Sequence, residues 1–407
     1  MSPLLPVAEA LARILADAAP VEAETVAIGE AAGRTLAADV AALRTQPPFT
    51  TSAMDGYAVR ADDVARVPAR LRVIGTSAAG HGLRGPVGPG EAVRIFTGAP
   101  MPEGADTVVI QEDADTEADA VRVREGNPPG RHVRASGLDF REGDLLLRAG
   151  ERLDGWRVAL AAAGGHPDLR VRRRPRVAVL ATGDELVRPG EPAAWDQIVA
   201  SNGLALAAMA VEAGAEAIDL GIAGDRFADL EAAIGRARDA RADLLITLGG
   251  ASVGDHDLVQ SALARQGLEL GFWRVALRPG KPLMHGRLGP MAVLGLPGNP
   301  VSSVVCGLVF VRPLIRALLG DPLAGADRTE PARLGCDLPA NDGRQDYMRA
   351  RLDTAPDRLP VAHPAARQDS SMLSVLAHAE ALLIRAPHAP AARAGDPCRI
   401  LRLDRSL

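Results

Sequence analysis

Glycines and acidic or hydroxyl side chains gather in four short stretches of this 407-residue sequence. Backbone N–H groups of a glycine-rich loop can surround a phosphate or another oxyanion, and a helix that follows the loop adds its positive N-terminal end. Together the stretches predict an anion-binding site, although each one alone is equally consistent with a plain turn or a structural helix cap. The four stretches are ATGDEL (181–186), AGDR (223–226), TLGGASVGDHD (247–257) and LPGNPVSS (296–303).

The carboxylates in these stretches, Glu185, Asp225, Asp255 and Asp257, would repel an anionic ligand unless a cation lay between them. Mg²⁺ commonly fills this role, held by one or two carboxylates together with phosphate oxygens of the substrate. We therefore predict a magnesium site at these acids. Four unrelated helix caps or surface acids are the alternative interpretation.

A single lysine stands in the stretch LRPGKPLMHG (277–286). Of the 46 basic residues, 45 are arginine and only Lys281 is lysine. An ammonium group is a compact point charge, whereas a guanidinium is a planar fork, and glycine lets the backbone approach a ligand closely. We expect Lys281 to contact an anion in a crowded site behind the Pro-Gly turn, with Arg278 beside it. A lysine left by chance on a solvated surface is the alternative.

Alternating strand and helix patterns between residues 176 and 320 predict the framework that positions these side chains. Such βαβ units form a mostly parallel sheet with helices on both faces. Because ligands bind at the carboxyl ends of the strands in such sheets, all four loops are expected at one edge. Asn299 is predicted as the N-cap of the last helix and Pro300 as its first residue. The expected strands are RVAVLAT, AIDLGIAG, DLLITLGG and MAVLGLPG.

The remainder of the chain has a different pattern. The first 40 or so residues are expected to be helical, and short β-rich runs between Gly/Pro turns predict a β domain over residues 45–140. A helix is expected at 157–166, and the last ~85 residues are expected to form a small β domain. At ~100–200 residues per domain, the length predicts two to four domains.

Composition excludes several classes of protein. A net charge of −5 gives no basic surface for nucleic acid, and the local run of Arg172, Arg173, Arg174 and Arg176 is interpreted as a solvated hinge. Three distant cysteines argue against a disulfide framework. The N-terminus lacks the pattern of a secretory signal, and residues 301–311 are too short an apolar run for a membrane span. A cytoplasmic protein that contacts no membrane is expected.

Six motifs, in this order, resemble the molybdopterin molybdenumtransferases of molybdenum cofactor biosynthesis, a family that includes the C-terminal domain of gephyrin. The resemblance covers residues 1 to about 350 and, more loosely, the rest. Taken alone, the Asp-Gly turn at Asp55 is consistent with a simple turn. The motifs are SAMDGYAV (52–59), FTGAPMPEGADTVVIQED (96–113), VLATGDEL (179–186), TLGGASVGDHD (247–257), RPGKP (278–282) and LPGNPVS (296–302).

The resemblance implies an α/β multidomain subunit with a three-layer α/β molybdopterin-binding domain. It also implies an elongated homodimer, with the active site between the α/β domain of one subunit and domains of the other. The implied domains are a discontinuous helical, dimerising domain (1–42 and 141–174), a β-rich domain (43–140), the molybdopterin-binding domain (175–322) and a small C-terminal β-barrel-like domain (323–407).

The reaction implied by the resemblance inserts molybdenum from molybdate into adenylylated molybdopterin and releases AMP, assisted by Mg²⁺. The implied catalytic residues are Asp55, Thr97, Asp139, Glu185 and Lys281, and the implied metal ligands are Glu185, Asp225 and Asp257. The chain departs from the family pattern at Arg278, where lysine is common, and at Leu138, where an acid is common. The implied substrate-binding residues are Thr182, Gly183, Gly249, Gly250, Ser252, Gly254, Arg278, Pro297, Gly298, Asn299, Pro300 and Arg349.

Two other functions are compatible with parts of the sequence. The α/β domain alone also resembles molybdopterin adenylyltransferases, which transfer a nucleotide, but the motif SAMDGYAV in the first half argues against that activity. A clustering scaffold of the gephyrin type would need partner-binding segments or a long linker, which are not expected here. Partner proteins implied by the resemblance are the molybdopterin adenylyltransferase and molybdoenzyme-maturation proteins.

Overall fold

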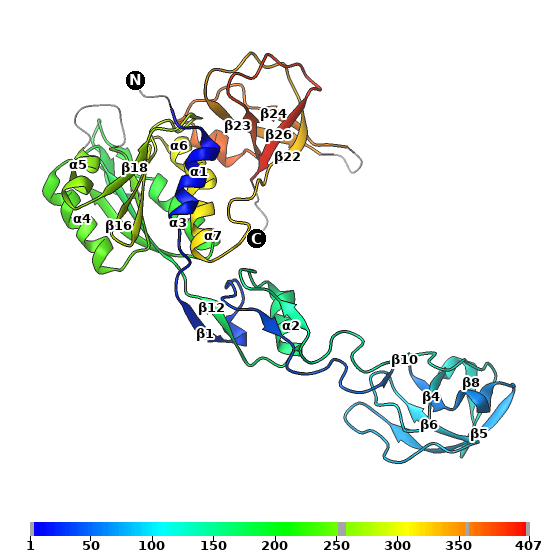
Figure 1. The fold of residues 1–407 in the computed structure, drawn as a ribbon. Helices are drawn as coiled ribbons and strands as arrows, with labels where there is room; N and C mark the ends of the chain where they lie inside the picture. Colours follow the sequence, from blue (N-terminus) through cyan, green and yellow to red (C-terminus); the bar gives the residue numbers. More distant parts are fainter. Residues whose placement is uncertain (1–3, 251–257, 355–357, 404–407) are drawn as a thin grey trace.

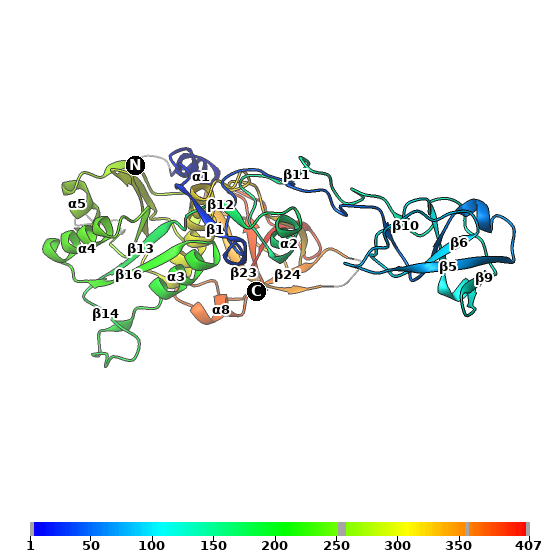
Figure 2. The same cartoon turned by 90° about the horizontal axis from the view of Figure 1, so that it is seen from below.

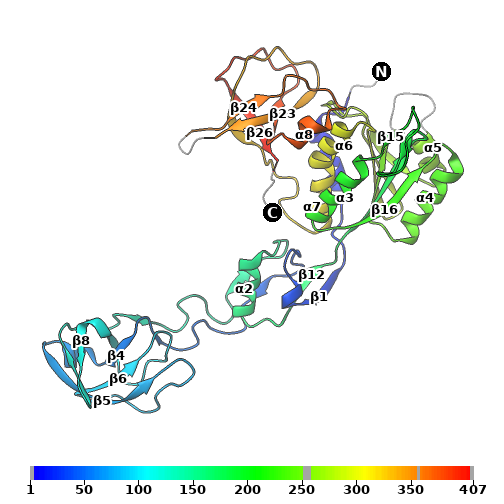
Figure 3. The ribbon, with the colours of Figure 1, turned by 180° about the vertical axis from the view of Figure 1, so that it is seen from behind.

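The computed structural model describes residues 4–250, 258–354 and 358–403. The chain is elongated, and all three views place the β-rich domain at one end (Figures 1–3). The α/β domain and the C-terminal domain lie side by side at the other end, joined to the β-rich domain through a small intermediate unit. The residues of one sequence motif can therefore lie far from the residues of another motif in the same chain.

The sheet of the α/β domain has the strand order β16-β13-β17-β21-β20-β18. The first four neighbours are parallel, as predicted from the alternating pattern. The last two strands in this order, β20 and β18, were not predicted from the sequence, and they pair antiparallel. The strands are β13 (Arg176–Thr182), β16 (Glu216–Ala223), β17 (Leu244–Leu248), β18 (Glu269–Trp273), β20 (Met284–Leu288) and β21 (Met291–Leu296).

Helices cover both faces of this sheet. Val177 and Val179 of β13 face one core cluster, whereas Ala178 and Leu180 face the other, because side chains alternate along a strand. The first cluster includes α3 and the run from α6 to α7, and the second includes α4 and α5. The helices are α3 (Asn202–Glu212), α4 (Phe227–Asp239), α5 (Leu258–Arg265), α6 (Pro300–Cys306), the π-helical turn η4 (Gly307–Val311) and α7 (Arg312–Leu318).

The continuous helical run Pro300–Leu318 is long and apolar enough to cross a membrane by length and composition. About two thirds of it (67%) is buried inside the fold. Phe310 and Ile315, for example, are fully buried in the first core cluster. This burial is typical of the core helix of a folded domain, and it accounts for the apolar run at residues 301–311.

The N-terminal helix α1 (Val7–Ala16) packs against α7 and belongs to the core of the α/β domain, through Val7, Ala10 and Ile14. The expectation that the first 40 residues are helical is wrong beyond Ala16. The next element is strand β1 (Ala23–Ala27), which pairs with residues far along the chain. A local helical pattern contains no signal of such a distant partner.

The intermediate unit is built from two separate segments of the chain, as expected for a discontinuous domain. β1 pairs with β12 (Asp168–Arg172), and β2 (Val40–Ala41) pairs with β11 (Leu145–Leu147). The predicted helix near 157–166 is α2 (Gly155–Ala163), in the second segment of the unit. The first segment contains the short helix η1 (Ile28–Glu30). A small hydrophobic core of its own holds this unit together. The unit contains two strand pairs, whereas the family resemblance implied a helical domain.

The basic run at residues 172–176 lies where the chain passes from this unit into the α/β domain. Arg173 donates from both terminal nitrogens to Asp243, at 2.7 Å each, and from Nε to Glu22 at 2.6 Å. The bonds to Asp243 and Glu22 raise the pKa of Arg173. Arg172 donates to the carbonyl of Val21 at 2.9 Å. Arg172 and Arg173 are therefore paired at this junction, in contrast to the solvated hinge that the sequence suggested, whereas Arg174 is exposed.

The β-rich domain is an insertion between the two segments of the intermediate unit. β3 (Thr51–Ser52) pairs with β10 (Val133–Arg134) where the chain enters and leaves it. Its sheet has the order β7-β4-β6-β5-β9-β8. The remaining elements are β4 (Gly56–Val59), η2 (Ala61–Val64), β5 (Ala69–Ser77), β6 (Glu91–Ile95), β7 (Thr107–Ile110), η3 (Gln111–Asp113), β8 (Ala114–Thr116) and β9 (Ala120–Val123).

The C-terminal domain is a small β-barrel, as predicted. Its strand order is β23-β24-β22-β26-β25, and the additional β23–β25 pairing closes it. Strand β19 (Leu277–Arg278) of the α/β domain extends this sheet beside β23. The elements are β22 (Glu330–Leu334), β23 (Gln345–Asp353), β24 (Val361–Pro364), α8 (Leu373–Ala377), β25 (Ala381–Arg385) and β26 (Pro397–Arg402).

Candidate active site

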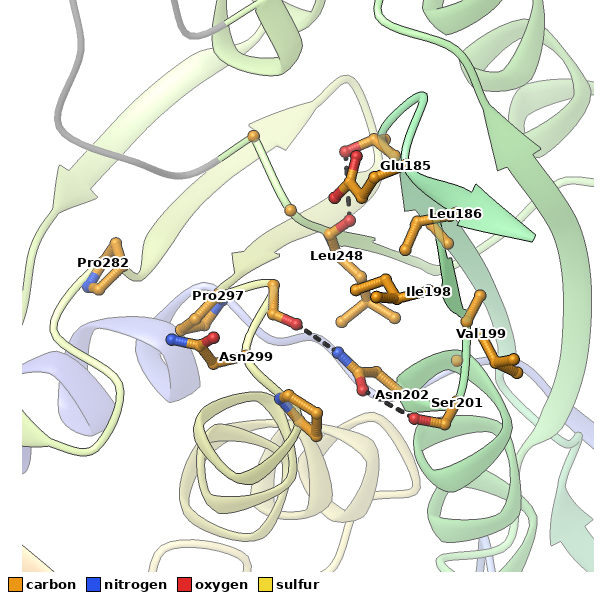
Figure 4. Close-up of a pocket in the computed structure, with 18 residues that line it drawn as sticks. Glu185, Leu186, Ile198, Val199, Ser201, Asn202, Leu248, Pro282, Pro297 and Asn299 are labelled. Carbon is orange, nitrogen blue, oxygen red and sulfur yellow. Dashed lines mark hydrogen bonds between the residues drawn. The ribbon is translucent and has the colours of Figure 1, made fainter. Parts of the chain in front are cut away.

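A cavity of about 400 Å³ opens at the carboxyl ends of β13 and β17 (Figure 4). The chain runs from β13 to β16 on one side and then to β17 on the other, so the strand order reverses at β13. Open α/β sheets bind ligands at such a switch point. Thr182, at the end of β13, is buried and donates to the carbonyl of Leu248, at the end of β17, at 3.1 Å. This bond joins the two loops that form the floor of the cavity.

Two glycines in these loops allow close approaches that a side chain would prevent. Gly249 has φ +93°, and a Cβ there would lie 2.7 Å from the carbonyl oxygen of Thr182. Gly183 has φ +140°, and a Cβ there would collide with the carboxylate of Glu185. The carboxylate of Glu185 thus lies close to the Cα of Gly183, and the Glu185 side chain lines the cavity. The predicted residues Thr182, Gly183, Glu185, Gly249 and Gly250 are brought together at this edge.

The opposite wall is the LPGNP loop and the start of α6. Asn299 occupies the N-cap and Pro300 the first helical position, as predicted, but no side-chain bond from Asn299 caps the helix. The backbone N–H of Val301 donates instead to the carbonyl of Ser370, in the C-terminal domain, at 3.0 Å. Asn202 at the start of α3 donates to the carbonyl of Gly298 at 2.6 Å and ties the two walls together (Figure 4).

Several cavity residues were missed by sequence reasoning. Ile198, Val199, Ser201 and Asn202 line the cavity, although none of the motifs singled out in the sequence contains them. Ser201 makes no capping bond to the helix. Ile198 and Val199 form the short strand β15, which pairs with β14 (Leu186–Val187) directly after the predicted ATGDEL loop. That adjacency is visible only in the fold.

The two basic residues of the RPGKP loop have different surroundings. The guanidinium of Arg278 donates to Asp346, to Asp342 at 3.0 Å and to Asn341 at 2.9 Å, and the bond to Asp346 raises the pKa of Arg278. Lys281 is exposed, beside the cavity residue Pro282, and its ammonium has no ion pair within the described residues. The uncompensated positive charge of this loop is therefore that of Lys281.

Arg349 lies inside the C-terminal domain on β23 and is 1% exposed. Its Nη2 donates to the carbonyl of Asp369 at 2.9 Å, but its Nε has no partner and no carboxylate pairs with it among residues 4–250, 258–354 and 358–403. Burial lowers the pKa of Arg349. Asp369 directly precedes Ser370, which contacts the start of α6, so Arg349 lies behind the loop that meets the cavity wall.

Asp55 and Thr97 form a second cluster in the β-rich domain. Oδ1 of Asp55 accepts hydrogen bonds from the backbone N–H of Thr97 at 2.7 Å and from its hydroxyl at 2.8 Å. The N–H bond, followed by the hydroxyl bond, lowers the pKa of Asp55, whose side chain is partly exposed. Asp139 is also exposed, and its backbone N–H donates to Gln46 at 3.1 Å on the segment leading out of this domain. Within one chain, these residues are not brought to the cavity (Figure 1).

Two of the three predicted metal ligands, Glu185 and Asp225, lie within the described residues. Asp225 is exposed, and its backbone N–H donates to Asp184 at 3.1 Å. Among the described residues, no group of three or more His, Cys, Asp or Glu side chains is arranged to hold a metal. Asp257 lies outside the described residues, as do Ser252, Gly254 and Asp255. The magnesium site therefore stays a prediction, with the exposed carboxylates of Glu185 and Asp225 as suitable oxygen donors.

Comparisons with known proteins agree with this arrangement. Three sequence families match consecutive parts of the chain: the MoeA N-terminal region (domain I and II) at residues 5–165, a probable molybdopterin binding domain at 178–317, and the MoeA C-terminal region (domain IV) at 331–403. A molybdopterin biosynthesis MoeA protein of Pyrococcus horikoshii has a similar structure. Its TM-score is 0.83 at 31% identity, covering 98% of this chain and 99% of that one.

Curated relatives share most of the length of the chain. A molybdopterin molybdenumtransferase of Nostoc is 40% identical over 357 residues, covering 86% of this chain and 81% of the relative. Molybdopterin molybdenumtransferase 2 of Mycobacterium tuberculosis is 39% identical, covering 81% and 83%. The corresponding Bacillus subtilis protein is 34% identical, covering 93% and 90%. With the fold, the order of the domains and these identities in agreement, the chain belongs to the molybdopterin molybdenumtransferase family.

Proposed function

We propose that this protein inserts molybdenum from molybdate into adenylylated molybdopterin, releases AMP and so forms molybdenum cofactor. The observation that carries the proposal is the cavity at the β13–β17 switch point, bordered by a loop with an uncompensated lysine. Cleaving the phosphoanhydride between pterin and AMP requires neutralisation of charge on phosphate oxygens and correct positioning of the reactants. Lys281 supplies a fixed positive charge for phosphate or molybdate oxygens, and the glycine loops supply backbone N–H donors.

Glu185, Asp225 and Asp257 are the proposed ligands of Mg²⁺. When bound, Mg²⁺ supplies a Lewis acid that neutralises phosphate charge. Glu185 fits this role because its exposed carboxylate lines the cavity. Asp184 holds the loop of Asp225 through the backbone N–H bond, so it keeps this ligand near the same edge.

Asp55, Thr97 and Asp139 complete the site from a second subunit in this proposal. Their distance from the cavity within one chain supports a homodimer in which the β-rich domain of one subunit reaches the α/β domain of the other. Asp55 is suited to accept a hydrogen bond or a proton, because one of its carboxylate oxygens, Oδ2, makes no bond to Thr97. We place the reaction in the cytoplasm, where a reducing environment suits three free cysteines. We also expect contact with the molybdopterin adenylyltransferase and with molybdoenzyme-maturation proteins.

The decisive assay compares two reactions of the purified protein. With adenylylated molybdopterin and molybdate, we expect AMP release that depends on molybdate. With ATP and molybdopterin, we expect no ATP consumption. The opposite result would identify an adenylyltransferase, and the absence of both reactions would leave a non-catalytic role.

The same assay tests the metal prediction. AMP release should require Mg²⁺ and stop when a chelator is added, because clustered carboxylates otherwise repel a substrate that carries phosphates. Glu185→Gln, Asp225→Asn and Asp257→Asn should each raise the Mg²⁺ concentration needed for half-maximal rate or lower the maximal rate. Glu212→Gln, a substitution on α3 away from the predicted ligands, is the matched control. Full activity in chelator would contradict the prediction.

A further inference from the structure

An extended loop leaves the α/β domain next to the cavity. Residues 188–197 connect β14 to β15 and project from the domain (Figure 2). The loop ends in a tight turn, in which the backbone N–H of Gln197 donates to the carbonyl of Ala194 at 3.1 Å. The side chain of Gln197 accepts from the N–H of Ala194 at 3.0 Å. Trp195 lies within this turn, so local bonds hold its backbone while its side chain is exposed.

Trp195 is 96% exposed, and Ile198 and Val199, which follow it, are 60% and 48% exposed. We call these three residues the apolar lip. The whole chain contains three tryptophans and only 3% aromatic residues, so a fully exposed tryptophan does not reflect an aromatic-rich composition. Large exposed apolar side chains that are close in the sequence are typical of binding surfaces, because covering each of them lowers the free energy.

The apolar lip is continuous with the candidate active site. Ile198 and Val199 line the cavity (Figure 4), and Trp195 is three residues away, within about 10 Å along an extended chain. The cavity of about 400 Å³ is at the small end of ligand pockets, which hold roughly 300–1,000 Å³. An adenylylated pterin has two ring systems joined through phosphates, so part of it must extend beyond this cavity.

We propose that the apolar lip stacks one planar nitrogen heterocycle of the substrate, with Trp195 providing the aromatic face. The inference rests on the proposed function and assigns a binding subsite to it. Indole rings stack on heterocycles without demanding a particular hydrogen-bond pattern, so the adenine and the pterin share the required chemistry. A stable protein interface buries ~1,200–2,000 Å² in total, and three side chains beside a cavity match a flat ring better.

Tryptophan fluorescence tests the proposal directly. In the variant Trp156→Phe/Trp273→Phe, Trp195 is the only tryptophan left. Titration with AMP and, separately, with 6-hydroxymethylpterin should change its emission saturably for at least one probe, and the probe that does so identifies the ring. If neither probe changes the emission, the proposal is wrong. A change that follows protein concentration alone would show that a second copy covers the lip, which also overturns the proposal.

Steady-state kinetics give an independent test. Trp195→Ala should raise KM for the adenylylated pterin about 5- to 150-fold with little change in kcat, as the loss of one stacked ring predicts, and Trp195→Phe should restore most of the affinity. Leu270→Ala, at a 46% exposed position on the edge strand β18, is the matched control and should leave KM unchanged. If Trp195→Ala is active and its KM is unchanged, the stacking proposal is wrong, but the proposed function stands. An inactive wild-type protein refutes the proposed function, while the fluorescence titration still decides the role of the lip.

Discussion

Lys281→Arg is expected to lose nearly as much activity as Lys281→Ala, about ten- to a hundredfold in rate or affinity. This range corresponds to the roughly 1.5–3 kcal/mol of a hydrogen bond to a charged group. A coding preference of 45 arginines to one lysine should already have placed arginine at this position if charge alone sufficed. Lys281 is exposed within a single chain, so the crowding that excludes a guanidinium must come from bound substrate and the opposing subunit. AMP release at varied molybdate concentration measures the effect.

Arg278→Lys is the matched comparison, because it changes a basic residue of the same loop in the opposite direction. The sequence alone suggests a mild effect. The structure shows that Arg278 joins the loop to Asp346, Asp342 and Asn341, and a lysine cannot reproduce that set of bonds. Arg278→Lys should therefore lower the melting temperature more than Lys281→Arg does. Wild-type kinetics in Lys281→Arg would mean that the lone lysine is an accident of the gene.

A mixture of two variants that each have little activity is expected to regain activity. Asp55→Ala removes a residue of the β-rich domain, and Lys281→Ala removes one beside the cavity. If each active site combines these residues from different subunits, a heterodimer has one intact site and one site with both lesions. Random exchange of equal amounts then restores about one quarter of wild-type AMP release, because half of the dimers are mixed and half of their sites are intact.

Two controls make the mixing experiment decisive. Exchange of subunits is verified by mixing differently tagged chains and recovering both tags together. A mixture of Glu185→Gln with Lys281→Ala should stay inactive, because both lesions lie in the α/β domain and every heterodimer site carries one of them. No recovery with Asp55→Ala, despite proven exchange, would exclude sites shared between subunits.

The parts of the fold that depend on local patterns could be predicted from the sequence. The alternation of apolar strands and amphipathic helices predicted β13, β16, β17 and β21 and their parallel pairing, but not the order of the strands. The glycine and proline positions predicted the turns of the β-rich domain and the start of α6. The membership of the family and the fold class were also predicted and are confirmed.

The rest depends on contacts between distant residues. β1 pairs with β12. Strand β20, whose sequence MHGRL contains His285 and Arg287 and lacks an alternating pattern, forms a hairpin with β21, and β18 then pairs with β20. The partners of Arg278 come from packing of its loop against the C-terminal domain, and Arg349 is buried within that domain, on β23. The roles of the predicted site residues stay predictions, because no single chain contains all of them in one place.

The insertion of the β-rich domain has a consequence for the order of folding. Pairing Ala23–Ala27 with Asp168–Arg172 closes a long loop, and the entropy lost on closure grows with the logarithm of loop length. The pairing of Thr51–Ser52 with Val133–Arg134 brings the two ends of the inserted domain together. Once that domain has folded, the chain left to close between β1 and β12 is reduced to residues 28–50 and 135–167. We expect the inserted domain to fold early and the β1–β12 pair to form late.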